Sequence, residues 1–457
     1  MTFTIDHWQR RLDDLAREHD VPGAVLGVLV GDEVHAAASG VLNRATGVAT
    51  TTDSLFQIGS ITKVYTATVV MRLAEQGRID IDRPVRELLP EFRVSDPETT
   101  QALTPRHLLC HTGGIGGDLV ADCGRGDDVL ERFVAACADA TQDVPFGTAM
   151  SYSNAGYSIL GRLIERGTGQ VWDHALRDLL LDPAGLTHTV TLPEDALRFR
   201  TAIGHVPGPD GDWQPSPVWG LPRFGGPAAG CCSDVADVLA FARLHLNGGL
   251  AADGSRVLAA ETVQEMLSPQ VTPADPWMAG SHWGLGWILN GRGGRRLFGH
   301  DGDTIGQKAY LQVLPDRGVA VVVLTNGGRS GTLAATLQDE LLAVLGDVPA
   351  SLWPQPVGDG RGAADDVIGV YERMGVRVTV TDTGGELTGT SELLEPLRSL
   401  MPDRAVTRFP VRASDRGPGV YVAHMEPDEE RWSPLVLFEI NGVRYIHLGV
   451  RAARKVG

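Results

Sequence analysis

The chain has 457 residues, 43% of them hydrophobic, and a formal net charge of −17. This length exceeds one ordinary domain, so we expect one large and one small domain. The negative charge argues against nucleic acid and anionic membrane surfaces as partners, whereas it would tolerate a substrate with a free amine.

The N-terminus carries acidic residues and lacks the basic start and apolar core of a secretion signal. We therefore expect the mature chain to begin here and to work in the cytoplasm. Ile5, Trp8, Leu12 and Leu15 recur at helical spacing and predict an amphipathic opening helix. The five cysteines form no C-x-x-C pair, so we expect buried free thiols.

Residues 24–42 predict two strands joined by a tight turn. The next segment, 60–76, predicts a buried helix because it carries little charge, and Gly77 ends it. Residues 103–240 have the character of helices and loops, with a helix expected at 156–167. Helix character then gives way to strands again.

Residues 296–326 return to strand character, with a hairpin turned at Pro315-Asp316. Strands early and late around a helical middle predict an α/β sandwich whose antiparallel sheet joins both ends of a domain spanning 1–348. A linker rich in Pro, Gly and Asp is expected at 349–366. Apolar and polar residues alternate along 376–381, and Asn441-Gly442 is a strong hairpin signal. Both features predict a small antiparallel β domain, a barrel or curved sheet, at 367–457.

The first chemical signal is Ser60-Ile61-Thr62-Lys63 at the start of the apolar helix. Residues three apart share a helix face, which places the lysine amine beside the serine hydroxyl. Burial lowers the pKa of a lysine, so Lys63 could accept a proton from Ser60. By itself the motif is weak, and a helix-capping serine with a snorkelling lysine explains it better.

Two further elements follow along the chain. Tyr152 and Asn154, two apart on a loop, should face one pocket, where Tyr152 could relay a proton if a nearby cation lowers its pKa. Gly299-His300-Asp301-Gly302-Asp303 precedes a strand, where a glycine would let a substrate backbone lie close to the strand edge. Taken singly, Tyr-Ser-Asn is a common loop composition, and His300 could be a core or surface histidine.

Together the three elements resemble the serine β-lactamase and penicillin-binding-protein superfamily in its class C branch, which carries S-x-x-K, Y-x-N and K/H-x-G in this order. The resemblance covers roughly residues 10–345. Further segments match the family's L-L-x-H-T-S-G, P-A-G-G and G-x-G-W patterns, namely 108–114, 227–230 with 233–234, and 284–287.

The resemblance implies a role for each matched residue. Ser60 would be acylated, Lys63 and Tyr152 would handle protons, Asn154 would orient the substrate, and His300 stands where relatives carry Lys or His. The backbone N–H groups of Ser60 and Asp303 would form the oxyanion hole. No metal and no cofactor is implied.

His300-Asp301-Gly302 stands where lactamases and carboxypeptidases usually carry K-T-G, so Asp301 takes the place of the Thr and Gly302 keeps the Gly. An aspartate would repel a substrate carboxylate and attract an ammonium, so we expect Asp301 to place the free amine of an acyl acceptor. Alternatively, Asp301 only orients His300 or the adjacent loop.

The H-D-G-D-T-I-G-Q segment and the appended β domain resemble the stand-alone penicillin-binding-protein-type thioesterases, which release nonribosomal peptides from carrier proteins by head-to-tail cyclisation. In that group a lipocalin-like C-terminal domain closes over the pocket. By this resemblance Arg451 could bind a peptide carbonyl or carboxylate, although an exposed solubilising arginine is the simpler interpretation.

The leading hypothesis is therefore an acyltransferase that takes a peptidyl group, with a D-residue at its C-terminus, from a thioester that a carrier protein can present. Release would give a macrolactam. The alternatives are a serine hydrolase (an esterase, a D-amino-acid peptidase or amidase, or a weak β-lactamase) and a non-catalytic binding protein of the same fold.

Overall fold

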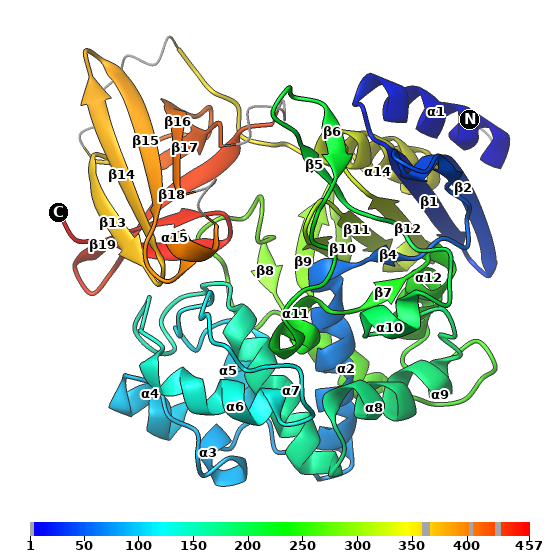
Figure 1. The fold of residues 1–457 in the computed structure, drawn as a ribbon, viewed down its shortest axis with the longest axis horizontal. Coiled ribbons are helices and arrows are strands. Elements are labelled where there is room, and N and C mark those ends of the chain that lie inside the picture. Colours follow the sequence, from blue (N-terminus) through cyan, green and yellow to red (C-terminus); the bar gives the residue numbers. More distant parts are fainter. Residues whose placement is uncertain (1–3, 359–365, 402–404, 426–430) are drawn as a thin grey trace.

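The computed structural model describes residues 4–358, 366–401, 405–425 and 431–457. Figure 1 shows an α/β domain carrying the N-terminus, with a β-barrel beside it that contains the C-terminus. In these described ranges, no helix has the length and apolar character needed to cross a bilayer.

One antiparallel sheet forms the centre of the larger domain, with the strand order β3-β2-β1-β12-β11-β10-β9-β8. Its strands are β1 (Gly23–Val30), β2 (Glu33–Asn43), β3 (Val48–Ala49), β8 (His282–Trp283), β9 (Ile288–Arg292), β10 (Arg295–Asp303), β11 (Lys308–Leu314) and β12 (Val319–Thr325). β1 pairs with β12, from Ala24 opposite Thr325 to Val30 opposite Val319. The prediction that this sheet joins early and late strands is confirmed.

Helices cover both faces of this sheet (Figure 1). Because successive strand residues point to opposite faces, Val321 and Val323 of β12 pack with α1 (Ile5–Glu18) and α14 (Ser330–Gly346). Val322 and Leu324 belong to the larger core on the other face, which includes α2 (Thr62–Glu75) and α12 (Val235–Leu246). Each such buried side chain stabilises the fold by roughly 1.5–3 kcal/mol.

The remaining helices lie mostly in the helical layer below the sheet in Figure 1. They are α3 (Val85–Leu88), α4 (Pro97–Ala102), α5 (Pro105–Leu109), α6 (Val129–Ala136), α7 (Asn154–Thr168), α8 (Trp172–Leu176), α9 (Asp182–Ala184), α10 (Pro193–Ala196), α11 (Gly226–Ala229) and α13 (Ala260–Met266). The helix predicted at 60–76 is α2 preceded by a 3-10 turn, and Gly77 after it has φ +66°. All five cysteines are buried and free.

The smaller domain is a closed antiparallel barrel, which confirms the predicted β domain. Its elements are β13 (Gly369–Arg373), β14 (Val376–Thr383), β15 (Glu386–Leu393), α15 (Leu397–Leu400), β16 (Val406–Ala413), β17 (Val420–Ala423), β18 (Ser433–Ile440), β19 (Val443–Leu448) and β20 (Arg451–Lys455). Asn441 and Gly442 turn the β18–β19 hairpin with φ +52° and +77°. The interior is apolar and contains Tyr371, Val380 and Phe409.

The predicted linker at 349–366 falls between α14 and β13. Part of it, 359–365, lies outside the described residues. Before that gap the chain contacts the barrel, because Trp353 Nε1 donates to the Trp432 carbonyl at 2.6 Å and Gln355 N–H to Asp415 Oδ1 at 3.0 Å.

Candidate active site

Ser60 lies in a 3-10 turn, η1 (Gly59–Ile61), directly before α2. Lys63 is on the first turn of α2, and its amine reaches the Ser60 hydroxyl at 3.1 Å, as the i to i+3 spacing predicts. Lys63 Nζ also donates to Asn154 Oδ1 and to the Ala228 carbonyl, both at 2.8 Å. The side chain of Lys63 is fully buried, so these three acceptors fix the amine beside the hydroxyl.

The environment favours the neutral form of this amine. Burial lowers the pKa of Lys63 well below its usual value, and Arg451 lowers it further, while Asp118 opposes the shift. A neutral Lys63 can accept the Ser60 proton, which an arginine at the same place could not do. The predicted direction of the lysine pKa shift is confirmed.

Tyr152 completes this group. Its ring centroid lies 4.6 Å from Lys63 Nζ and 4.4 Å from the ring of His111, and Trp283 packs edge-on at 5.8 Å. The side chain is buried. Aromatic rings on several sides therefore hold the tyrosine against the lysine amine.

Burial decides the protonation state of Tyr152. A nearby cation could lower the pKa of this tyrosine, but burial raises it despite the opposing effects of Ser60 and Arg451. Ser60 is thus near enough to affect this hydroxyl, yet among the described residues the hydroxyl meets no partner with hydrogen-bond geometry. Tyr152 is therefore adjacent to Ser60 but not bonded to it, and it can act as a proton donor or relay that stays protonated at neutral pH.

Two glycines bring the predicted oxyanion-hole amides together. A Cβ on Gly302 would lie 1.9 Å from the Ile58 carbonyl oxygen and 3.0 Å from Ser60 N. A Cβ on Gly59, whose φ is +51°, would lie 2.6 Å from Asp303 N. The backbones carrying the Ser60 and Asp303 amides therefore touch. At Gly302 the chain leading into Ser60 occupies the space that a side chain would need, and a substrate backbone along the strand edge stays a prediction.

The end of β10 offers one open strand edge. β9 pairs with β10 only from Arg295 to Gly299, whereas β11 pairs with it as far as Asp303. His300 is buried, and its Nδ1 lies 2.6 Å from the Asp301 carbonyl oxygen. Burial lowers the pKa of His300 to about 3, with Lys63 as the second cause, so this imidazole is neutral at physiological pH.

Asp301 presents a carboxylate at the same edge, and its side chain is exposed. Desolvation by surrounding atoms raises the pKa of Asp301 to about 6, and Arg431 of the barrel opposes that rise. Because solvent reaches the group, we expect solvation to limit this shift. In either case Asp301 is mainly ionised at pH 7.

Arg451, at the start of β20, brings the barrel to this site. Its guanidinium carbon lies 5.6 Å from the ring centroid of Tyr152, and its Nη2 pairs with Asp118 Oδ1 at 2.8 Å. Only 18% of its side chain is exposed. The interpretation of Arg451 as an exposed solubilising residue is therefore wrong.

His111 supports the site but was given no role from the sequence, although the Leu108–Gly114 segment marked its position. Its Nδ1 accepts a hydrogen bond from the Ser153 N–H at 3.1 Å. Burial lowers the pKa of His111 well below its usual value, followed by the charge of Lys63. A neutral His111 can therefore hold the Tyr152 loop through this bond and through ring packing.

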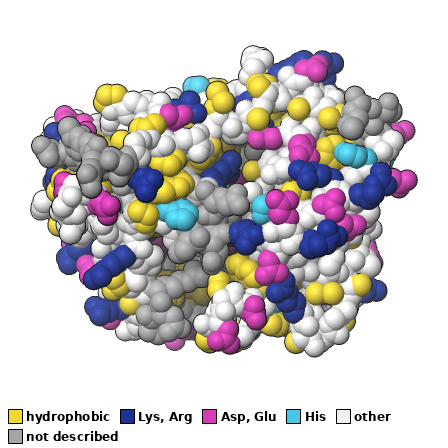
Figure 2. Space-filling view, turned by 90° about the horizontal axis from the view of Figure 1, so that it is seen from above, with side chains coloured by type: hydrophobic (Ala, Val, Ile, Leu, Met, Phe, Trp, Pro, Cys, Tyr) yellow, Lys and Arg dark blue, Asp and Glu magenta, His cyan; other side chains and the backbone are white. Residues whose placement is uncertain are grey.

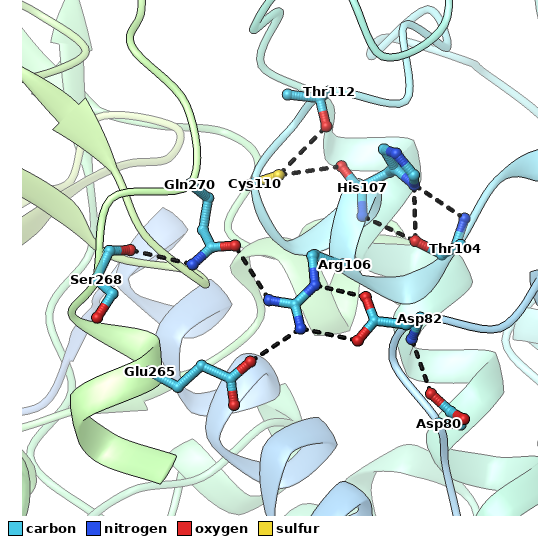
Figure 3. Close-up of polar contacts among 10 residues, drawn as sticks. All are labelled: Asp80, Asp82, Thr104, Arg106, His107, Cys110, Thr112, Glu265, Ser268 and Gln270. Atoms are coloured by element: carbon cyan, nitrogen blue, oxygen red, sulfur yellow. Dashed lines mark hydrogen bonds and ion pairs between the residues drawn. The ribbon is translucent and has the colours of Figure 1, made fainter. Parts of the chain in front are cut away.

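The short helix α5 lies just before His111, and ion pairs to residues of other segments hold it in place (Figure 3). Arg106 forms a bidentate pair with Asp82 at 2.6 and 2.9 Å and a further bond to Glu265 at 2.9 Å. Thr104 and His107 form a capping box at the start of the helix. The position of His111 thus depends on an ion-pair network that joins α5 to α13.

The comparisons with known proteins agree with this geometry. The family model described as Beta-lactamase matches residues 8–345. Penicillin-binding protein 4 of Amycolatopsis lactamdurans is 47% identical over 378 residues, which cover 82% of this chain and 99% of that protein.

Among solved structures, the crystal structure of SurE is 27% identical, covers 99% of both chains and superposes with a TM-score of 0.78. A second SurE structure, with D-Leu, gives a TM-score of 0.72. D-amino acid amidase from Ochrobactrum anthropi, complexed with L-phenylalanine amide, is 25% identical and covers 71% of this chain and 91% of its own, with a TM-score of 0.60. The chain is thus a serine hydrolase- or acyltransferase-type enzyme that belongs to the β-lactamase and penicillin-binding-protein family.

Proposed function

We propose that this enzyme takes a peptidyl group from a thioester onto Ser60 and releases it by attack of the peptide's own N-terminal amine, which gives a macrolactam. The observation that carries the proposal is the barrel turn at Val450–Arg451, which lies against Tyr152 and adds a cationic wall to a family active site. A peptidyl thioester, presented free or by a carrier protein, would be the substrate.

In the first step Ser60 Oγ attacks the thioester carbonyl while Lys63 takes the hydroxyl proton. The backbone amides of Ser60 and Asp303 would stabilise the oxyanion of the tetrahedral intermediate. The C–S bond then breaks, and the proton reaches the thiolate through Lys63 and Tyr152. The products are a free thiol and an ester on Ser60.

In the second step the amine nitrogen attacks the ester carbonyl and forms the amide bond. The C–O bond to Ser60 breaks, and one amine proton returns to Ser60 Oγ through Lys63. Asp301 would attract the incoming ammonium along the open edge of β10, since opposite charges favour that approach, and the ammonium would lose one proton to solvent before its nitrogen attacks. Arg451 would bind a peptide carbonyl on the opposite wall.

Two neighbours favour a D-residue at the acylated end. The SurE structure that covers the whole chain, barrel included, contains D-Leu. The amidase neighbour is named for D-amino acids.

The second candidate is a hydrolase, in which water replaces the amine in the second step. The D-amino acid amidase likeness favours this alternative, and a neutral Lys63 could take a proton from water as it could from an amine. A non-catalytic binding protein fits less well, because Ser60, Lys63 and Asn154 lie within bonding distance.

Product analysis by mass spectrometry tests the proposal. Synthetic linear peptidyl thioesters ending in L- or D-residues would be incubated with wild type, Ser60→Ala and Asp301→Asn. We expect wild type to form a product lighter by one water than the linear acid, selectively from D-ending peptides. Asp301→Asn should shift the ratio toward linear acid. Linear acid alone from wild type, with faster turnover of simple esters or D-amino-acid amides, would establish the hydrolase instead.

A further inference from the structure

The barrel contacts the larger domain through two hairpin turns. In the β13–β14 turn, Met374 N–H donates to Asp143 Oδ1 at 2.8 Å, and the side chain packs so closely on Gly116 that a Cβ there would lie 2.6 Å from Met374 Cβ. In the β19–β20 turn, the Val450 carbonyl accepts a hydrogen bond from Tyr152 N–H at 3.0 Å.

The second turn therefore holds the backbone of the Tyr152 loop directly. Ser151 Oγ also accepts a hydrogen bond from Ala452 N–H at 3.1 Å. Val450 itself packs in the apolar cluster with Tyr152 and Trp283. Two hydrogen bonds thus join residues 151–152 to the β19–β20 turn and the start of β20, and the barrel fixes part of the active site.

One carboxylate joins both turns. Asp118 Oδ2 pairs with Arg373 Nη1 of β13 at 2.6 Å, and Asp118 Oδ1 pairs with Arg451 Nη2 of β20 at 2.8 Å. Between 16% and 20% of each of the three side chains is exposed, so the pairs are only weakly screened by solvent. Burial alone would raise the pKa of Asp118, but Arg451 and Arg373 hold it below its usual value.

We propose that Asp118 is a positioning residue that clamps the two barrel turns together and, through Arg451, holds the Tyr152 loop and the charge beside Lys63 in their working arrangement. The inference rests on the proposed acylation of Ser60 with Lys63 as base, but not on cyclisation. If Asp118 has this role, the barrel positions residues that acylation of Ser60 requires and does not only close over the pocket.

The clamp has a charge consequence as well as a geometric one. Arg451 lowers the pKa of Lys63 and Asp118 raises it, so the pair sets how readily the amine accepts a proton. The other titratable groups around Lys63 are His111, His300, Tyr152 and Tyr157. Burial lowers the pKa of the two histidines and raises that of the two tyrosines, so all four stay neutral near pH 7. Removal of the Asp118 charge should therefore be visible in the pH profile.

The test uses the full chain and a fluorescent serine-reactive phosphonate, which forms a phosphonate ester with Ser60 Oγ and so reports activation of this nucleophile without any cyclisation. Asp118→Asn keeps one hydrogen bond to Arg451 but loses the charge. We expect its labelling rate to fall on the order of tenfold and the midpoint of its pH profile to move to lower pH. Asp118→Glu, which restores the charge, should return the midpoint toward wild type.

The matched control is Asp32→Asn, which removes an aspartate–arginine pair at a site where Asp32 is 96% exposed. Thermal melting of each variant shows whether the fold is retained. A lower melting temperature with an unchanged midpoint would reduce Asp118 to a structural residue and overturn the proposal, and so would a midpoint at or above the wild-type pH. Absence of labelling in wild type would instead contradict the proposed function itself.

Discussion

The two walls of the active site differ in how they use charge. The wall from the larger domain carries Lys63, His300 and His111, all buried and all shifted toward their neutral forms. The wall from the barrel carries Arg451 and Arg373, whose charges Asp118 partners. Burial thus keeps the first wall neutral, so that Lys63 can accept a proton, whereas ion pairs keep fixed charges on the other wall, where they can position groups but not exchange protons.

The largest expected effect comes from the wall of the larger domain, which holds Lys63. Lys63→Met keeps the length of the side chain but removes the proton acceptor, so we expect acylation of Ser60 to fall by about 10²–10⁴-fold. In wild type the rate should rise with pH through the lowered pKa of Lys63, because only the neutral amine accepts a proton.

Stopped-flow acylation over a pH series measures both effects. Lys455→Met is the matched control, since Lys455 lies near the end of β20, where its amine donates to the Ile368 carbonyl at 2.6 Å. Equal rates in the Lys63 and Lys455 variants would show that another group takes the Ser60 proton.

A second prediction concerns the close contact between Gly302 and the segment before Ser60, which brings the backbone amides of Ser60 and Asp303 together. Gly302→Ala would place a Cβ 1.9 Å from the Ile58 carbonyl oxygen and so displace the segment before Ser60. We expect a loss of about 1–3 kcal/mol in the free energy of unfolding and a fall of about 10²-fold in acylation rate.

Gly291→Ala on β9 is its control, because a Cβ there meets nothing nearer than 3.9 Å. Chemical denaturation and acylation kinetics would be compared for the two variants. If Gly302→Ala behaved like Gly291→Ala, the close packing of β10 on η1 would have no role in forming the oxyanion hole.

Much of this site could be predicted from the sequence, because short-range spacing decides it. Lys63 reaches Ser60 through one helical turn, and the His300–Asp303 segment carries its own strand pattern. The motif order further indicated that distant segments meet at one place. The same local patterns predicted the sheet, α2 and the barrel hairpins.

The features that the sequence did not predict depend on contacts between distant segments. The Asp118–Arg451 pair spans 333 residues of sequence, and no local pattern indicates which turn of a barrel meets which loop. The sequence also left open whether a nearby cation lowers the pKa of Tyr152. Only the packed structure shows that burial outweighs the charge of Arg451.

The smallest expected effect concerns Asp301. Its carboxylate is ionised at pH 7 and attracts an ammonium, and the attraction is lost as pH falls through the raised pKa of this group. The apparent KM for amine-bearing peptidyl thioesters should therefore rise a fewfold from pH 7 to pH 5. Asp301→Asn, or a peptide with an acetylated N-terminus, should lack this dependence, and an unchanged pH dependence in that variant would remove Asp301 from amine binding.

The most direct test of the account is to map the covalent adduct by peptide mass spectrometry after brief reaction with a peptidyl thioester. We predict one acyl group on the tryptic peptide that contains Ser60 in wild type, its absence in Ser60→Ala, and its slow appearance in Lys63→Met. An acyl group on another residue, or product formation by Ser60→Ala at the wild-type rate, would contradict the assignment of Ser60 as the nucleophile.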